Sequence, residues 1–120
     1  MSLTAFALAA ALAQTSLSAG AAVPAADVGY RELAAGDAAA AVTKLEVAAQ
    51  ESTDPATLIN LGTAYARQGA TDKALAAYRA AIASDDRYDL ELADGTWMDS
   101  RDAARQALAR LQLATAQALR

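Results

Sequence analysis

Residues 55–86 constrain the fold more than any other part of this sequence, because two apolar stripes at helical spacing lie on either side of a glycine, Gly69. The stripes consist, in chain order, of Leu58, Leu61, Ala64 and Tyr65, and then of Ala74, Leu75, Tyr78, Ala81 and Ile82. Glycine ends a helix readily because it adopts the left-handed conformation without steric cost. Thr71 or Asp72 could then cap the second helix through a side-chain oxygen. We therefore predict two antiparallel helices that pack on each other.

The spacing of these residues resembles that of the tetratricopeptide repeat family, whose signature of Trp, Leu-Gly and Tyr, then Ala and Phe, then Pro covers about 34 residues. The matching positions here are Leu58, Leu61, Gly62, Tyr65, Ala74 and Tyr78, with Asp86 in place of the closing Pro. A glycine facing an alanine lets two helices approach closely. The resemblance implies an all-α fold of antiparallel helix-turn-helix repeats, a short α-solenoid.

A weaker copy of the pattern precedes this stretch at an offset of 33 residues. Gly29 and Gly36 correspond to Gly62 and Gly69, and the copy continues with Ala41 and Leu45 in the places of Ala74 and Tyr78. Its first helix has few large apolar residues, and Glu32 stands where Tyr65 does. We predict a degenerate repeat over residues 22–54, with helices near 25–35 and 37–51 and Asp37 as the cap of the second, followed by the closer repeat over residues 55–88.

Residues 89–120 break the repeat pattern. An Asp-Gly pair at residues 94–95 lies between alternating apolar and polar residues, which predicts a β-hairpin with a two-residue turn and Leu92 opposite Trp97. The alternative is a structured loop that holds Trp97 against the core. The Asp-Ser pair at residues 99–100 offers a cap for a long helix over residues 101–119, which we predict to be the capping helix of the solenoid.

Residues 1–26 contain no charged side chain. An apolar run, a more polar run and then the small residues Ala19 and Ala21 follow the order of a secretory signal. We interpret residues 1–21 as a signal peptide, so that the mature chain is exported, to the periplasm, and contains no membrane span. The segment lacks the Lys or Arg with which such a signal normally opens. The alternative is an Ala-rich packing helix in a chain that stays in the cytoplasm.

The inventory of reactive side chains argues against catalysis. The chain contains neither histidine nor cysteine, which removes the commonest general base, thiolate nucleophiles and the usual zinc ligands. The carboxylates within residues 85–89 and 99–102 lack the spacing of a calcium-binding loop. A net charge of −4 without a basic patch disfavours a nucleic-acid partner. We expect no enzyme activity, no cofactor, no metal and no nucleic-acid binding.

The resemblance also implies a function, because the first helices of tetratricopeptide repeats line a concave groove that binds peptides of partner proteins. By that resemblance, the partner-binding residues are Ile59, Asn60, Thr63 and Arg67 in the closer repeat and Tyr30 and Arg31 in the weaker one. Asn60 would bond a peptide backbone and Arg67 a carboxylate; alternatively, Asn60 belongs to the framework and Arg67 is solvated at a helix end. We expect a non-catalytic adaptor that binds a partner protein or peptide. The alternatives are a structural module that self-associates into a homo-oligomer through apolar helix faces, and an accessory subunit of an enzyme.

Overall fold

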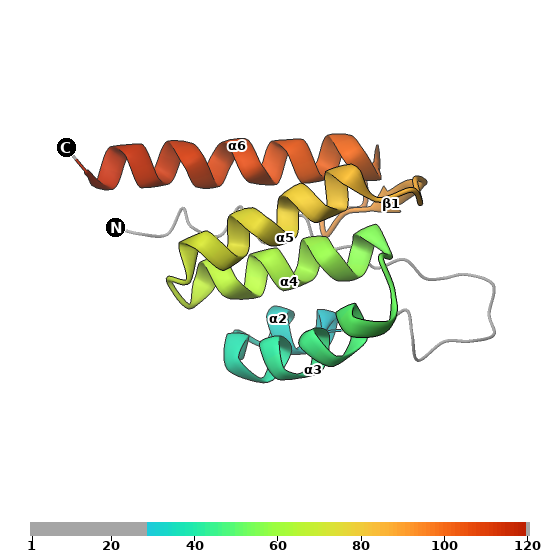
Figure 1. Ribbon diagram of the computed structural model, residues 1–120, viewed down its shortest axis with the longest axis horizontal. Coiled ribbons are helices and arrows are strands. Elements are labelled where there is room, and N and C mark those ends of the chain that lie inside the picture. The colour runs from blue at the N-terminus through green and yellow to red at the C-terminus, as the bar shows by residue number, and fades with distance from the viewer. Residues whose placement is uncertain (1–28, 120) are drawn as a thin grey trace.

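The structure is a computed structural model that describes residues 29–119 (Figure 1). Within that range the chain is mostly helical, and five helices pack against each other beside a small two-stranded antiparallel sheet. The predicted helical class is confirmed and a small hairpin is present, while the arrangement of the helices as an α-solenoid remains a prediction. The elements in chain order are α2 (Tyr30–Ala34), α3 (Ala38–Glu51), α4 (Pro55–Arg67), α5 (Thr71–Ala83), β1 (Asp89–Glu91), β2 (Trp97–Asp99) and α6 (Ser100–Ala118). The proposed signal peptide, residues 1–21, lies outside the described residues. The helix predicted over residues 25–35 begins only at Tyr30, because Gly29 before it has the left-handed φ of 73°; residues 25–28 lie outside the described range.

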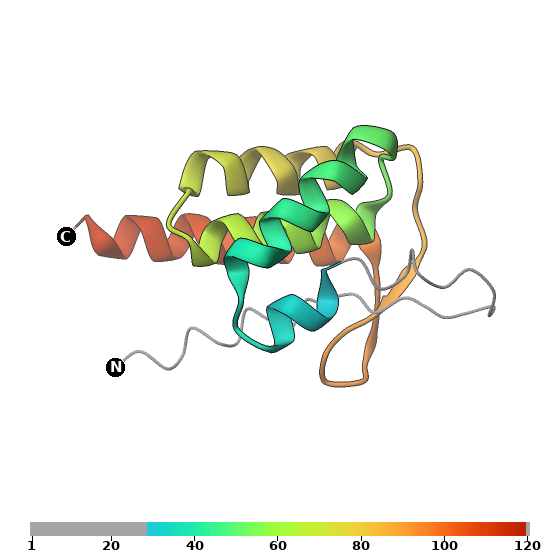
Figure 2. The same ribbon diagram turned by 90° about the horizontal axis from the view of Figure 1, so that it is seen from below.

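Helix α4 lies at the centre of the molecule and contacts α2, α3, α5 and α6. In Figure 1, α6 runs along one side of the α4–α5 pair while α2 and α3 lie on the other, and Figure 2 shows α3 crossing α4 obliquely. Ten successive residues of α4, Pro55 to Ala64, are buried. A helix buried on all its sides is a core helix, so the rest of the described chain is built around it.

Aspartates at three helix starts fix where those helices begin. Asp37 accepts a hydrogen bond from the backbone N–H of Ala40, and Asp99 accepts from two N–H groups of α6, as predicted. Asp54 accepts from the backbone N–H of Thr57 at the start of α4. Helix α5 differs because it has Ala70 as its cap residue and no side-chain cap, so the prediction that Thr71 or Asp72 caps it is wrong. Gly69, with φ of 79°, ends α4, and the chain re-enters a helix at Thr71, which leaves no oxygen-bearing side chain at the cap position.

The close approach of two helices depends on a glycine facing a large side chain. A Cβ atom added at Gly62 would lie 2.6 Å from Cε1 of Tyr78, and one added at Gly29 would lie 2.5 Å from Cδ1 of Leu45. Both distances are shorter than any real Cβ contact. The two pairs are related by the same offset of 33 residues. Gly62 lies within α4, whereas Gly29, with φ of 73°, directly precedes α2, so the corresponding contact with α3 is made at the start of α2.

The hairpin is present, but its register differs from the predicted one by one residue. Glu91 pairs with Trp97, and the backbone N–H of Leu92 donates to the carbonyl of Thr96 at 2.7 Å. The loop is therefore three residues long and ends at Gly95, whose φ is 90°. The predicted two-residue turn and the predicted pairing of Leu92 with Trp97 are wrong.

The register decides which side chains of the hairpin face the core, because a shift of one residue reverses the faces of a strand. Leu90 is fully buried, and its cross-strand partner Met98 packs against the same cluster of apolar residues. Trp97 points to the other side and is 60% exposed. The prediction that Trp97 contributes to the core is therefore wrong as well.

Candidate functional site

Three of the six predicted partner-binding residues are buried. Ile59 is 0% exposed and Asn60 and Thr63 are each 2% exposed. Ile59 belongs to the same buried cluster as Ala103, Ala104 and Ala107 of α6. The face of α4 that was predicted to line a groove is thus covered by other helices of the same chain in this structure.

Thr63 uses its side chain within the core. Its hydroxyl lies 3.0 Å from the hydroxyl of Tyr78, and either oxygen can donate the hydrogen bond. Burial raises the pKa of Tyr78 above the ordinary value for tyrosine, because the ionised ring would be poorly solvated there. The pair therefore stays neutral and joins α4 to α5.

The other three predicted residues lie nearer the surface. The guanidinium of Arg67 donates a hydrogen bond to the carbonyl of Leu33 at 2.6 Å, and burial lowers the pKa of Arg67. This bond links the end of α4 to α2, the helix that carries the half-buried Tyr30 and the exposed Arg31. The structure thus brings Arg67 close to α2, but a partner-binding role for any of the six residues remains a prediction.

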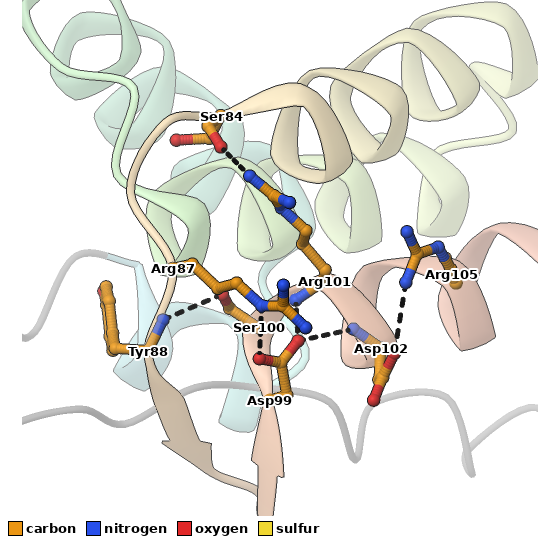
Figure 3. A network of polar contacts seen from close by, with 8 residues as sticks. All are labelled: Ser84, Arg87, Tyr88, Asp99, Ser100, Arg101, Asp102 and Arg105. Atoms are coloured by element: carbon orange, nitrogen blue, oxygen red, sulfur yellow. Dashed lines mark hydrogen bonds and ion pairs between the residues drawn. The ribbon is translucent and has the colours of Figure 1, made fainter.

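A polar network ties the hairpin to α5 and α6 (Figure 3). Asp99 accepts hydrogen bonds from Nε of Arg87 at 2.7 Å and from two backbone N–H groups at the start of α6. The hydrogen bond from Arg87 holds the pKa of Asp99 below its usual value. Ser100 and Tyr88 exchange two hydrogen bonds, and Arg101 donates to the carbonyl of Ser84 at the end of α5 at 3.1 Å. These contacts fix the hairpin to the helices.

Two tyrosines connect elements through carboxylates. Tyr65 of α4 donates a hydrogen bond to Glu46 of α3, and Tyr88 donates to Asp54, the cap of α4. Burial, with the hydrogen bond to Glu46 as a further cause, raises the pKa of Tyr65 to about 12. Burial also raises the pKa of Tyr88. Both phenols are neutral at physiological pH, which fits a structural role.

The exposed apolar side chains form two surfaces that the sequence analysis did not identify. Every residue from Gln112 to Leu119 is exposed, including Leu113 at 61% and Leu119 at 82%. We call these eight residues the projecting end of α6, because the helix continues past the turn between α4 and α5 in both views (Figures 1 and 2). Leu113 lies on the opposite side of the helix from the apolar stripe of Ala104, Ala107, Leu108 and Leu111, and this position was the signal in the sequence that Leu113 would be exposed.

The second surface is the outward side of the hairpin, where Trp97 stands beside acidic residues. Along the two strands Leu90 and Met98 face the core, so their neighbours face outward. We call Asp89, Glu91 and Trp97 together the hairpin face. An exposed Trp has a large apolar area and commonly anchors protein interfaces.

Within residues 29–119 there is no group of three or more carboxylates that could hold a metal ion. No helix in that range is long and apolar enough to cross a membrane.

Comparison of the chain with protein-family models, with curated proteins and with solved structures gave no match. The resemblance to tetratricopeptide repeats therefore depends on the residue spacing in the sequence.

Proposed function

We propose that this chain is a non-catalytic protein-interaction module that presents the projecting end of α6 to a partner protein. The observation that carries the proposal is that α6 continues for two turns beyond the core with every residue exposed and with Leu113 and Leu119 among them. Burying one such leucine against a partner is worth about 1.5–3 kcal/mol. The segment combines these two leucines with three alanines and the polar residues Gln112, Thr115 and Gln117. Exposed apolar surface rimmed by polar residues is typical of an interaction site.

The sequence supports a binding role over a catalytic one, because a chain without histidine and cysteine lacks the usual groups for acid-base and thiolate chemistry. The glycine contacts shared by α2–α3 and α4–α5 support a repeat scaffold of the tetratricopeptide type, and we include that relation in the proposal. The predicted groove residues enter the proposal where they reach the surface, at Tyr30, Arg31 and Arg67.

Site-specific photo-crosslinking in the cell that produces the protein tests this function. A photoreactive phenylalanine analogue would replace Leu113 in one variant and Val47 in a matched control; Val47 lies on α3 and is 58% exposed. We expect a discrete covalent adduct from position 113 that is absent from position 47 and weakened by Arg110→Glu. If position 113 gave no adduct, or if both positions gave the same adducts, the proposal would be refuted.

A further inference from the structure

The two ends of α6 differ in charge. Residues 85–99, which include the hairpin, contain six acidic side chains and one basic one, a formal charge of −5. After Asp102 the sequence contains three arginines, Arg105, Arg110 and Arg120, and no acidic residue. The whole chain has a net charge of only −4, so its negative charge is concentrated at the hairpin end.

The hairpin face combines an aromatic ring with carboxylates that have no cationic partner in the described part of the chain. Arg87 pairs with Asp99, whereas Asp89 and Glu91 form no ion pair within residues 29–119. Glu91 is the cross-strand neighbour of Trp97. A tryptophan ring beside carboxylates favours a guanidinium that also carries apolar surface, because Arg stacks on aromatic rings and pairs with carboxylates.

The projecting end of α6 has the complementary chemistry. Arg110 is exposed and precedes Leu113 by three residues, so the two side chains lie on neighbouring positions of one helix face. Arg110 reaches Gln106 at 3.5 Å, the outer limit for a hydrogen bond, whereas Arg105 is already paired with Asp102 at 3.2 Å. The projecting end thus has an exposed leucine, Leu113, and the exposed guanidinium of Arg110 lies one turn before it on the same helix face.

We propose that copies of this chain associate head to tail, with the projecting end of α6 of one copy docked on the hairpin face of the next. Leu113 would pack on the ring of Trp97, and Arg110 would approach Asp89 and Glu91. This inference rests on the proposed function and names its partner as a second copy of the chain. We choose a second copy because one sequence contains both surfaces of the contact. The hairpin face has an exposed aromatic ring and two carboxylates, and the end of α6 has an exposed leucine and a guanidinium.

One molecule cannot form this contact within itself. The hairpin precedes the first residue of α6 and the projecting end is its last two turns, so twelve residues of rigid helix, residues 100–111 and about 18 Å long, separate them. Each copy therefore uses two different surfaces, and such a heterologous contact continues into an open chain or closes into a ring. The charges make the association weaker as salt concentration rises.

The test is the molar mass of the full chain in solution, measured by sedimentation equilibrium from about 10 μM to about 1 mM protein, a range that detects weak association. We expect a mass that rises with protein concentration and falls with added salt. Trp97→Ala and Leu113→Ala should each weaken association by roughly tenfold or more, since each truncates an apolar anchor. Val47→Ala is the matched control and should associate as the natural chain does. All three side chains are exposed, and circular dichroism verifies the fold of each variant.

Mixing the two variants gives the decisive measurement. Trp97→Ala retains a working α6 end and Leu113→Ala retains a working hairpin face, so an equimolar mixture should form a complex that stops at two copies. A chain that stays monomeric throughout would overturn the proposal. Symmetric pairing of two α6 helices would also overturn it, because Leu113→Ala would then lose association while Trp97→Ala kept it.

The two proposals can fail separately. A monomeric chain that still gives an adduct with another protein from position 113 would leave the proposed function standing and reject self-association. A chain that gives no adduct from position 113 would reject the proposed function itself.

Discussion

Replacing Gly62 by alanine tests whether the contact between α4 and α5 is as close as the structure indicates. The new methyl group would lie 2.6 Å from Cε1, 2.7 Å from Cδ1 and 3.1 Å from Cζ of Tyr78. Tyr78 is 1% exposed and its hydroxyl is hydrogen-bonded to Thr63, so the ring cannot turn away without losing that bond. The substitution therefore sets a gain in helix propensity against overpacking.

The magnitudes of these two effects decide whether the substitution lowers or raises the free energy of unfolding. Glycine to alanine inside a helix is worth about 1 kcal/mol of stabilisation. Overpacking a buried site costs about 1–3 kcal/mol, and losing the buried hydrogen bond costs about 1 kcal/mol more. We expect Gly62→Ala to lower the free energy of unfolding by about 1–3 kcal/mol, with a fall in melting temperature of about 4–8 °C for each kcal/mol in a domain of this size.

Urea unfolding followed by circular dichroism measures this change, and a second substitution isolates its cause. Tyr78→Val lacks all three atoms that the methyl group would meet. In the Tyr78→Val background, Gly62→Ala should therefore be neutral or stabilising by up to about 1 kcal/mol, and the difference between the two backgrounds is the coupling energy of the pair. Ala76→Gly, at an exposed position of α5, reports the propensity contribution by itself.

The reasoning is refuted if Gly62→Ala raises the stability of the natural chain. It is also refuted if the substitution destabilises both backgrounds equally, since the cost would then not come from Tyr78.

Three further predictions concern the hairpin and the ionisable groups. Leu90→Ala should lower the free energy of unfolding by about 2–4 kcal/mol because Leu90 is fully buried. Leu92→Ala should lower it by about 1 kcal/mol or less in the same urea assay. Equal decreases for the two variants would contradict the observed register. The hydrogen bond from Arg87 lowers the pKa of Asp99 below the ordinary value of 3.8, so the stability that this bond contributes is present at neutral pH and is lost as pH falls through the folded-state pKa. Arg87→Met should therefore flatten the acid side of a plot of melting temperature against pH. An unchanged plot would contradict this prediction. The pKa of Tyr65 is raised from an ordinary 10.0 to about 12, so the neutral phenol contributes stability that is fully present below pH 10 and is lost as pH rises through about 12. The tyrosinate absorbance of the natural chain minus that of Tyr65→Phe should titrate with a midpoint near 12. A midpoint near 10 would contradict the burial of this side chain.

Helices α3, α4 and α6 could be predicted closely from the sequence because each has a local signal, whereas α2 is shorter than the predicted helix over residues 25–35 and α5 has no side-chain cap. Asp37 and Asp99 cap α3 and α6, Gly69 ends α4, and Pro55 is the first residue of α4. These signals act within one turn of the chain, so a single sequence contains them. The Asp-Gly pair likewise predicted a hairpin, but it suits both a two-residue turn and a three-residue loop that ends at a left-handed glycine.

The surroundings of α4 could not be predicted in the same way. Asn60 and Thr63 are polar and lie at positions that the resemblance assigns to a groove, yet both are buried because α4 has neighbours on all sides. The stripe of a helix indicates which face is apolar, but the number of helices that cover the remaining faces depends on residues far away in the chain. Here α6 covers part of α4 with alanines, and an alanine in a sequence does not indicate whether it will be buried because its side chain is small.

The side chains of α6 follow an order that stability alone does not explain. One face of its first half contributes Ala103, Ala104 and Ala107 to the core, and the half-buried Leu108 and Leu111 pack against them, while its exposed second half contains Leu113 and Leu119. A helix selected only to cover the core would have the large apolar residues where they are buried and the small ones where they are exposed, because burial stabilises in proportion to apolar area. Alanines in the first half let α6 approach the α4–α5 pair closely, whereas Leu113 and Leu119 leave their apolar area in solvent within residues 29–119. This distribution supports our proposal that a partner binds the projecting end of α6 rather than the buried face of α4.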